Sequence, residues 1–215
     1  MRNSVLVVLA LFLALPALAQ SRVPANRTAA LQGISAADEG RRLEAVEWLA
    51  ANGRQTDTEI LVQHLTDESP LVRSAAEQGL WTLWSHSGDK AVDALLRDGV
   101  EQMEAGELQQ AIATFSEVIK RKPDFAEGWN KRATALFLAG EFKRSLADCD
   151  EVLRRNPFHF GALAGYGQIY FQLEQYGKSI EYWKRALRVN PNMEGVEMNI
   201  KGTEKLLDER RKRAI

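Results

Sequence analysis

Residues 157–191 read PFHFGALAGYGQIYFQLEQYGKSIEYWKRALRVNP, a segment that begins and ends on prolines 34 residues apart. Pro123 stands another 34 residues before Pro157, so three prolines mark a fixed period. A proline ends a helix because it lacks an N–H group and disfavours helix in the residue before it. This spacing predicts an array of helix pairs, each closed by a proline.

Other positions recur with the same period. They are the glycines Gly106 and Gly140, the valines Val118 and Val152, and the packing positions Phe115, Cys149 and Trp183. Small residues at Gly99, Ala133 and Gly167 are expected where the two helices of a unit approach most closely. The pattern predicts an all-α helical-repeat solenoid of antiparallel helix pairs, in which neighbouring units bury each other's apolar faces.

The repeat resembles the tetratricopeptide repeat. Its third copy carries most of that pattern, in Leu163, Tyr166, Gly167, Tyr170, Ser179, Trp183, Ala186 and Pro191. The resemblance covers residues 89–213 and implies units at about 92–125, 126–159 and 160–193, followed by a capping helix. It also implies a non-catalytic module that binds a protein or peptide partner in a concave groove.

The first helix of each unit is expected to line that groove. Met103, Phe137 and Phe171 recur at one equivalent position and are expected to form an apolar stripe, which would either bind a peptide or cover helix seams. The remaining expected groove residues are Leu96, Val100, Asn130, Lys131, Thr134, Leu138, Ala164, Gln168 and Gln172. Members of the family that grip a C-terminal carboxylate use several cations, whereas only Lys131 is cationic at the matching places here.

Residues 36–88 are helical but do not follow the period of 34. Asp67, Pro70, Val72, Arg73, Ala76 and Leu80 resemble part of a HEAT repeat, in which the Asp and the Arg stabilise turns between units. Ser69 and Pro70 are expected to begin a helix, as a cap followed by proline at the first position. We expect this HEAT-like segment to join the later repeats through residues 86–88 as one curved rod.

Residues 1–19 have the features of a secretory signal peptide. Arg2 is followed by an apolar run over residues 5–15 and by a small-x-small site at Ala17 and Ala19, which predicts cleavage before Gln20. An uncleaved anchor is disfavoured, since spanning a membrane takes about 20 apolar residues. We therefore expect a periplasmic or secreted protein, with a flexible linker over residues 20–35.

The composition and the motifs disfavour several classes of function. The 215 residues include 28 basic and 29 acidic side chains, a near-neutral balance that disfavours nucleic-acid binding. Cys149 is the single cysteine, so an internal disulfide is excluded. The three histidines lie on separate segments, and no phosphate-binding loop or HExxH motif occurs, so we expect no metal and no cofactor.

The expected function is a non-catalytic scaffold or adaptor of the cell envelope. Two alternatives remain open, an accessory subunit of an envelope enzyme and a self-associating structural oligomer. The basic tail over residues 210–213 is a candidate for weak contact with an anionic surface, although cations are also favoured at the end of a helix by its dipole.

Overall fold

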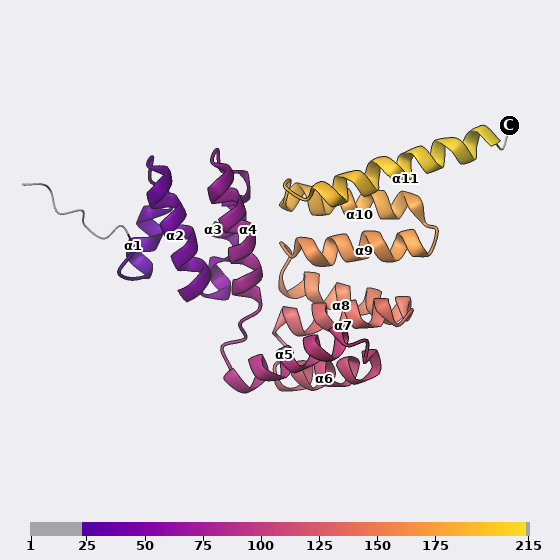
Figure 1. Cartoon of the computed structure of the whole chain (residues 1–215), viewed down its shortest axis with the longest axis horizontal. Coiled ribbons are helices and arrows are strands. Elements are labelled where there is room, and N and C mark those ends of the chain that lie inside the picture. Colours follow the sequence, from indigo (N-terminus) through magenta and orange to yellow (C-terminus); the bar gives the residue numbers. More distant parts are fainter. Residues whose placement is uncertain (1–22, 214–215) are drawn as a thin grey trace, which may run out of the picture.

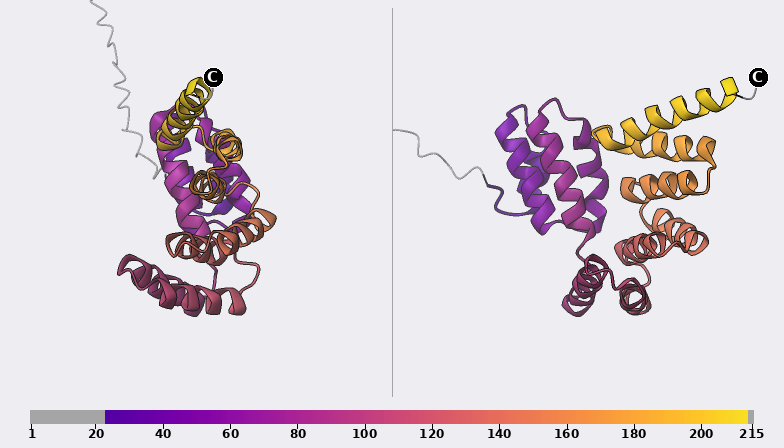
Figure 2. Two further views of the ribbon diagram at one scale, coloured as in Figure 1. Left: turned by 90° about the vertical axis from the view of Figure 1, so that its right-hand side faces the viewer. Right: turned by 45° about the vertical axis from the view of Figure 1, so that its right-hand side comes forward.

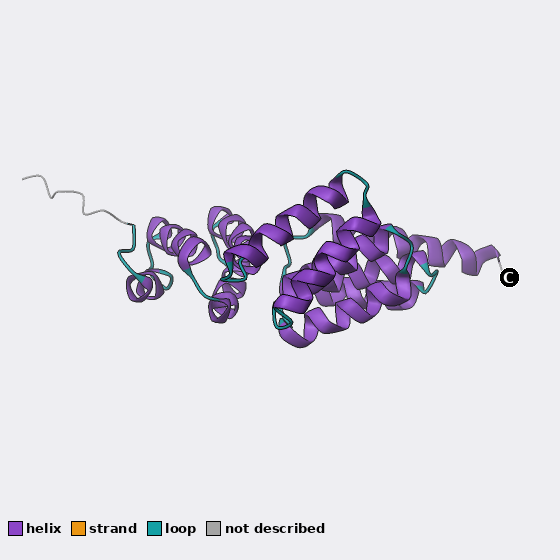
Figure 3. Ribbon diagram, turned by 90° about the horizontal axis from the view of Figure 1, so that it is seen from below, coloured by secondary structure: helices purple, strands orange, loops and turns teal. Residues whose placement is uncertain are grey.

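The computed structural model describes residues 23–213, and within this part of the chain the regular secondary structure consists of helices joined by loops (Figure 3). The N-terminal helices are α1 (Arg27–Gly33), α2 (Glu39–Asn52), α3 (Thr58–Gln63) and α4 (Pro70–Trp84), with short 3-10 turns at Gln55–Asp57 and His64–Thr66. The C-terminal helices are α5 (Lys90–Glu104), α6 (Leu108–Arg121), α7 (Ala126–Leu138), α8 (Phe142–Arg155), α9 (Phe160–Gln172), α10 (Tyr176–Val189) and α11 (Glu194–Arg213). The predicted all-α fold class is confirmed.

Helices α5–α10 form the three predicted pairs. Each pair ends two residues before Pro123, Pro157 or Pro191, as the spacing of the prolines predicts. The signal peptide predicted at residues 1–19 lies outside the described residues. Among residues 23–213, none of the helices has the length and apolar character needed to cross a membrane.

Within each unit, residue size is matched across the helix pair. A Cβ atom at Gly99 would lie 2.5 Å from the Phe115 ring, and one at Gly167 would lie 2.2 Å from the Trp183 ring. The second unit has Ala133 and the smaller Cys149 at the equivalent positions. Units with glycine on one helix therefore have a large aromatic residue on the facing helix, and the unit with alanine has a smaller one. This matching of sizes keeps the interior close-packed.

The turn between the two helices of a unit also repeats. Gly106 and Gly140 adopt positive φ values of 80° and 76°, which glycine allows at little cost. Glu174 occupies the same place in the third unit with φ 55°. The third turn therefore carries backbone strain that the other two avoid.

The last helix, α11, caps the array as predicted. Val196, Ile200 and Thr203 are buried against the third unit, whereas Lys201 and Glu204 are exposed. A polar outer face of this kind keeps the end of a solenoid soluble.

The N-terminal helices pack as two pairs, which we call the N-terminal module (residues 27–84). Ser69 begins α4 as predicted, because its hydroxyl accepts hydrogen bonds from the N–H groups of Leu71 and Val72. Asp67 accepts two hydrogen bonds from Arg42, at 2.9 and 3.0 Å, and Arg73 donates to the backbone carbonyl of Asp67. These contacts tie the turns between the helices of the module.

The flexible linker predicted for residues 20–35 is wrong over its second half. Residues 27–33 form α1, which begins at Asn26 through a side-chain hydrogen bond to Ala29 N–H. Ala30 and Ile34 are buried against the module, and Arg27 pairs with Asp57. A helix of only 7 residues is too short to show a clear hydrophobic period in the sequence. It is also too short to be stable alone, so these tertiary contacts stabilise it.

The expected continuous rod is also wrong. The N-terminal module lies beside the repeats, next to the ends at which α9 and α11 begin (Figures 1 and 2). Trp81 packs edge-on against Phe160 with ring centroids 5.0 Å apart, and Trp84 stacks on His159 at 4.5 Å. The Asn192 side chain donates a hydrogen bond to the carbonyl of Leu65. The chain thus folds back on itself, and these contacts between the module and the start of α9 hold the two parts together.

Candidate functional site

The first helices of successive units, α5, α7 and α9, lie along one side of the array, and α11 continues this series. Contacts join α5 to α7 and α7 to α9 across neighbouring units more closely than the second helices contact one another. The array therefore curves toward the first helices. Three hollows lie between consecutive members of this series, and together we call them the groove.

The hollow between α5 and α7 has a volume of about 430 Å³ and mixed charge. Its lining residues are Ser85, His86, Asp93, Leu96, Arg97, Val100, Glu101 and Lys131. The Lys131 ammonium lies 3.2 Å from the carboxylate of the buried Glu127. Because the charge of Lys131 is already paired, this cation is poorly placed to hold a ligand carboxylate.

The hollow between α7 and α9 is smaller, at about 130 Å³, and no charged side chain lines it. Its lining residues are Asn130, Ala133, Thr134, Phe137, Ser145, Cys149, Gly161, Ala162, Gly165, Gln168 and Ile169. The hollow between α9 and α11, about 210 Å³, is also uncharged and is lined by Gln168, Phe171, Trp183, Met198, Asn199, Gly202, Thr203 and Leu206. The groove thus changes from charged at its first unit to uncharged at its last.

The structure brings eight of the twelve expected groove residues into these hollows. They are Leu96, Val100, Asn130, Lys131, Thr134, Phe137, Gln168 and Phe171. Met103, Leu138, Ala164 and Gln172 line none of them.

The three residues of the expected apolar stripe are half-buried and belong to three separate packing clusters. Phe137 contacts Phe142 and Phe171 contacts Trp183, with ring centroids 5.8 and 5.9 Å apart. Phe137 and Phe171 each cover a seam within a unit, as one of the two interpretations predicts, and each also lines a hollow.

A buried polar chain beside the groove was not anticipated from the sequence. His159 Nδ1 accepts a hydrogen bond from the N–H of Ala162, and Nε2 lies 3.0 Å from the carboxylate of Glu127. Both side chains are fully buried, and Trp84 of the N-terminal module stacks on the imidazole. Burial alone would raise the pKa of Glu127, but hydrogen bonds and charge from His159 and Lys131 outweigh it and hold that pKa below its usual value. These hydrogen-bonded and stacked side chains join two repeats to the N-terminal module.

Cys149 lies at the floor of the hollow between α7 and α9 and is only 3 % exposed. Burial, together with the nearby charges of Asp148 and Asp150, raises the pKa of its thiol to about 12. The thiolate that reacts as a nucleophile is therefore strongly disfavoured, as predicted.

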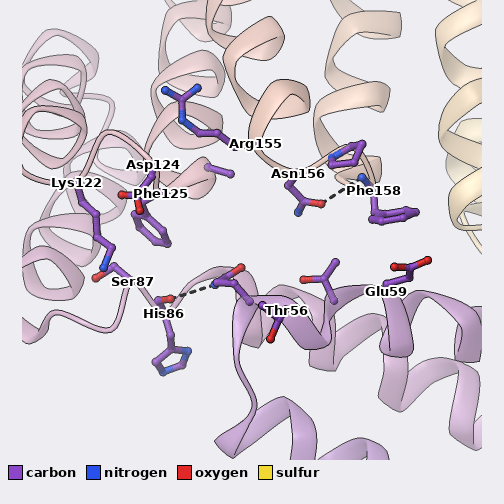
Figure 4. Close-up of a pocket in the computed structure, with 14 residues that line it drawn as sticks. Thr56, Glu59, His86, Ser87, Lys122, Asp124, Phe125, Arg155, Asn156 and Phe158 are labelled. Carbon is purple, nitrogen blue, oxygen red and sulfur yellow. Dashed lines mark hydrogen bonds between the residues drawn. The ribbon is translucent and has the colours of Figure 1, made fainter.

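A further hollow of about 430 Å³ separates the N-terminal module from the turns that precede α7 and α9 (Figure 4). Glu59 and Asp124 balance Lys122 and Arg155 along its walls, so no single charge dominates. Arg155 donates to the carbonyl of Pro123 and lies over the Trp129 ring. Across residues 23–213, no three His, Cys, Asp or Glu side chains gather as a metal site would require.

Comparison with known proteins agrees with the repeat pattern. Residues 96–160 match one family profile described as tetratricopeptide repeat, and residues 160–193 match a second with the same description. Residues 96–193 are therefore tetratricopeptide repeats. A TPR repeat-containing protein of Rhizobium etli is 29% identical over 108 residues, which are 50% of this chain and 53% of that protein. The match thus spans about half the length of the relative.

Solved structures show the same fold. The first TPR domain of Spaghetti (RPAP3), bound to an HSP90 peptide, has a TM-score of 0.52 and 20% identity, covering 54% of this chain and 93% of that domain. The TPR2B domain of yeast Sti1, in a pHsp70 complex, has a TM-score of 0.52 and 20% identity, covering 55% and 99%. At this identity the likeness concerns the fold.

Proposed function

We propose that this chain is a non-catalytic scaffold or adaptor that binds an extended or helical segment of a partner protein in the groove. The observation that carries the proposal is the series of three hollows between successive first helices, two of them uncharged. Half-buried aromatic side chains in a concave setting supply apolar contact area, and unpaired amides bind backbone groups. Two domains of similar fold hold peptides, which supports the same use of the groove here.

The proposal is tested by placing a charge in the groove. Gln168 lines two of the hollows and is half-buried, so Gln168→Glu adds a charge with almost no change of shape. We expect capture of crosslinked partners from the native envelope fraction to fall at least tenfold, with thermal melting unchanged. The matched control is Gln110→Glu, at an exposed position on α6 away from the groove.

Equal capture by Gln168→Glu and the native protein would move the binding surface elsewhere. The N-terminal module is then the next surface to test, by Leu71→Glu. Leu71 is 62 % exposed and lines a hollow of about 420 Å³ between α2 and α4.

Location in the periplasm or outside the cell is part of the proposal and rests on Arg2, the apolar run and the small-x-small site. Mass spectrometry of the native protein is expected to find Gln20 as the first residue. A native chain that begins at Met1 and fractionates with cytoplasmic markers would contradict this location without affecting the groove.

A further inference from the structure

Helix α9 contains three glycines, and packing accounts for two of them. A Cβ atom at Gly161 would lie 2.4 Å from Trp81, and one at Gly167 would lie 2.2 Å from Trp183. A side chain at either position would displace a tryptophan, so contacts within the chain explain both residues.

Gly165 is different, because no packing contact among residues 23–213 requires a glycine there. A Cβ atom there would lie 4.0 Å from its nearest neighbour, the Cys149 sulfur, which is an ordinary van der Waals distance. Glycine inside a helix destabilises a protein by roughly 1 kcal/mol relative to alanine. The missing side chain instead keeps open the hollow between α7 and α9, which Gly165 lines.

That hollow has the size of one amino-acid side chain. Its volume is about 130 Å³, and an apolar cavity of about 150 Å³ accommodates a benzene-sized group. Phe137, Cys149 and Ile169 supply apolar walls. No charged side chain lines the hollow, so a carboxylate or ammonium group would lose its hydration there without gaining an opposite charge.

Two amides with unused hydrogen-bonding groups stand beside the apolar walls. Asn130 is only 9 % exposed, and its Nδ2 donates to Glu127, but its Oδ1 accepts no hydrogen bond from any residue in 23–213. The amide of Gln168 likewise makes no hydrogen bond within this part of the chain. The Asn130 oxygen retains contact with solvent, so it is accessible to a hydrogen-bond donor that arrives with a ligand.

We propose that the hollow between α7 and α9 is a specificity pocket for one uncharged apolar side chain, of the size of Leu, Met or Phe, from the bound polypeptide. Asn130 Oδ1 and the Gln168 amide hold the backbone on either side of that residue. This inference rests on the proposed function and adds to it the chemistry of the partner at one position.

The test selects ligands from a random library of twelve-residue peptides with free C-termini, using the purified chain. Selected peptides are expected to share one uncharged apolar residue at a fixed place and to bind equally well when synthesised with an amidated C-terminus. Gly165→Leu fills the pocket from inside and should weaken their binding at least tenfold. The matched control is Gly177→Leu, at an exposed position on α10 where a Cβ meets nothing within 4 Å.

A second variant tests the size of the pocket without relying on Gly165→Leu. Gly165→Ala adds one methyl group at an ordinary contact distance and should fold at least as stably as the native chain. Reselection of the library on this variant is expected to replace the large apolar residue by a smaller one, such as Val or Ala.

Three results would overturn the pocket. They are selected peptides without a common apolar residue, a dependence on the free carboxylate, and unchanged binding by Gly165→Leu together with unchanged selection by Gly165→Ala. If the peptides still lose affinity with Gln168→Glu, the groove stands and the pocket alone fails. If the library yields no peptide that binds, the proposed function fails together with the pocket.

Discussion

The N-terminal module and the tetratricopeptide units are both built from helix pairs around an apolar core, and both contain buried ion pairs, but only the units repeat a packing contact. In the module, single contacts such as the buried pair of Arg42 with Asp67 tie the turns. In the first and third units, a glycine faces an aromatic residue at the same place, as at Gly167 and Trp183. Size matching repeats with the period of the sequence, whereas an ion pair between residues 25 apart has no period. Only the first kind of contact is visible in a repeat pattern.

The largest expected effect comes from the residue that serves both regions. Trp84 is 2 % exposed, donates a hydrogen bond to Thr58 within the module and stacks on His159 of the third unit. We expect Trp84→Ala to lower the free energy of unfolding by about 3–5 kcal/mol, the usual cost of removing a buried aromatic side chain. Urea denaturation followed by circular dichroism measures this.

A matched control for Trp84 is Trp129→Ala. The Trp129 ring is half-exposed and lies beneath Arg132 and Arg155. Removal of this ring should lower the free energy of unfolding clearly less than Trp84→Ala does. Similar losses for both variants would show that contact between the module and the third unit does not stabilise the protein.

The next effect tests size matching inside a unit. Gly167→Ala places a Cβ against the Trp183 ring, and overpacking of this kind typically costs about 1–3 kcal/mol. Gly177→Ala, at an open position of α10, should instead stabilise the protein slightly because alanine favours helix. Thermal melting of both variants checks the prediction, and it fails if Gly167→Ala melts at or above the native temperature.

The charged contacts of the module predict a dependence on pH. Hydrogen bonds from Arg42 hold the pKa of Asp67 below its usual value. The stability that this pair contributes is therefore complete above about pH 4, where the unfolded carboxyl ionises, and is lost as the pH falls through the lower folded pKa.

Melting temperatures measured between pH 7 and pH 3 test this dependence. Asp67→Asn should melt lower at neutral pH and lose less on acidification than the native protein. Glu117 also has a lowered pKa, mainly because Arg121 donates a hydrogen bond to it, but this pair is exposed. Glu117→Gln should therefore change little. An acid profile of Asp67→Asn that parallels the native profile would exclude a stabilising role for this pair.

The smallest expected effect concerns the turn of the third unit. Glu174 has φ 55° where the other units have glycine, and a side chain in this region costs about 1 kcal/mol. Glu174→Gly should therefore stabilise the protein by up to about 1 kcal/mol. The lost pair with Arg210 is exposed and contributes little. Gly140→Ala should destabilise the protein by a similar amount. Changes of opposite sign in the stability of these two variants, measured by calorimetry, would support the comparison of the turns.

The periodic part of the molecule follows from the sequence. The prolines place the ends of the helix pairs, Gly99 and Gly167 mark the close approaches, and Cys149 occupies the predicted buried position. These features depend on contacts within a unit or between adjacent units. Such contacts recur at a constant separation, so a single sequence displays them several times.

The candidate groove was predicted in part for the same reason. Phe137 and Gln168 lie on first helices and line hollows as expected. Gly165 was missed as a residue that lines a hollow, because only coordinates show which glycine in α9 faces a tryptophan and which faces a hollow.

What the sequence by itself determined is the all-α repeat, its three units and its cap, because local helix signals and a fixed period specify them. Only the tertiary structure decided that the N-terminal module folds back onto the repeats. That arrangement depends on single contacts between distant residues, such as Asn192 with Leu65, which are separated by 127 positions. The stacking of Trp84 on His159 and the pairing of His159 with Glu127 are of the same kind. Such contacts form once and carry no repeat, so they arise only when the packed helices bring their side chains together.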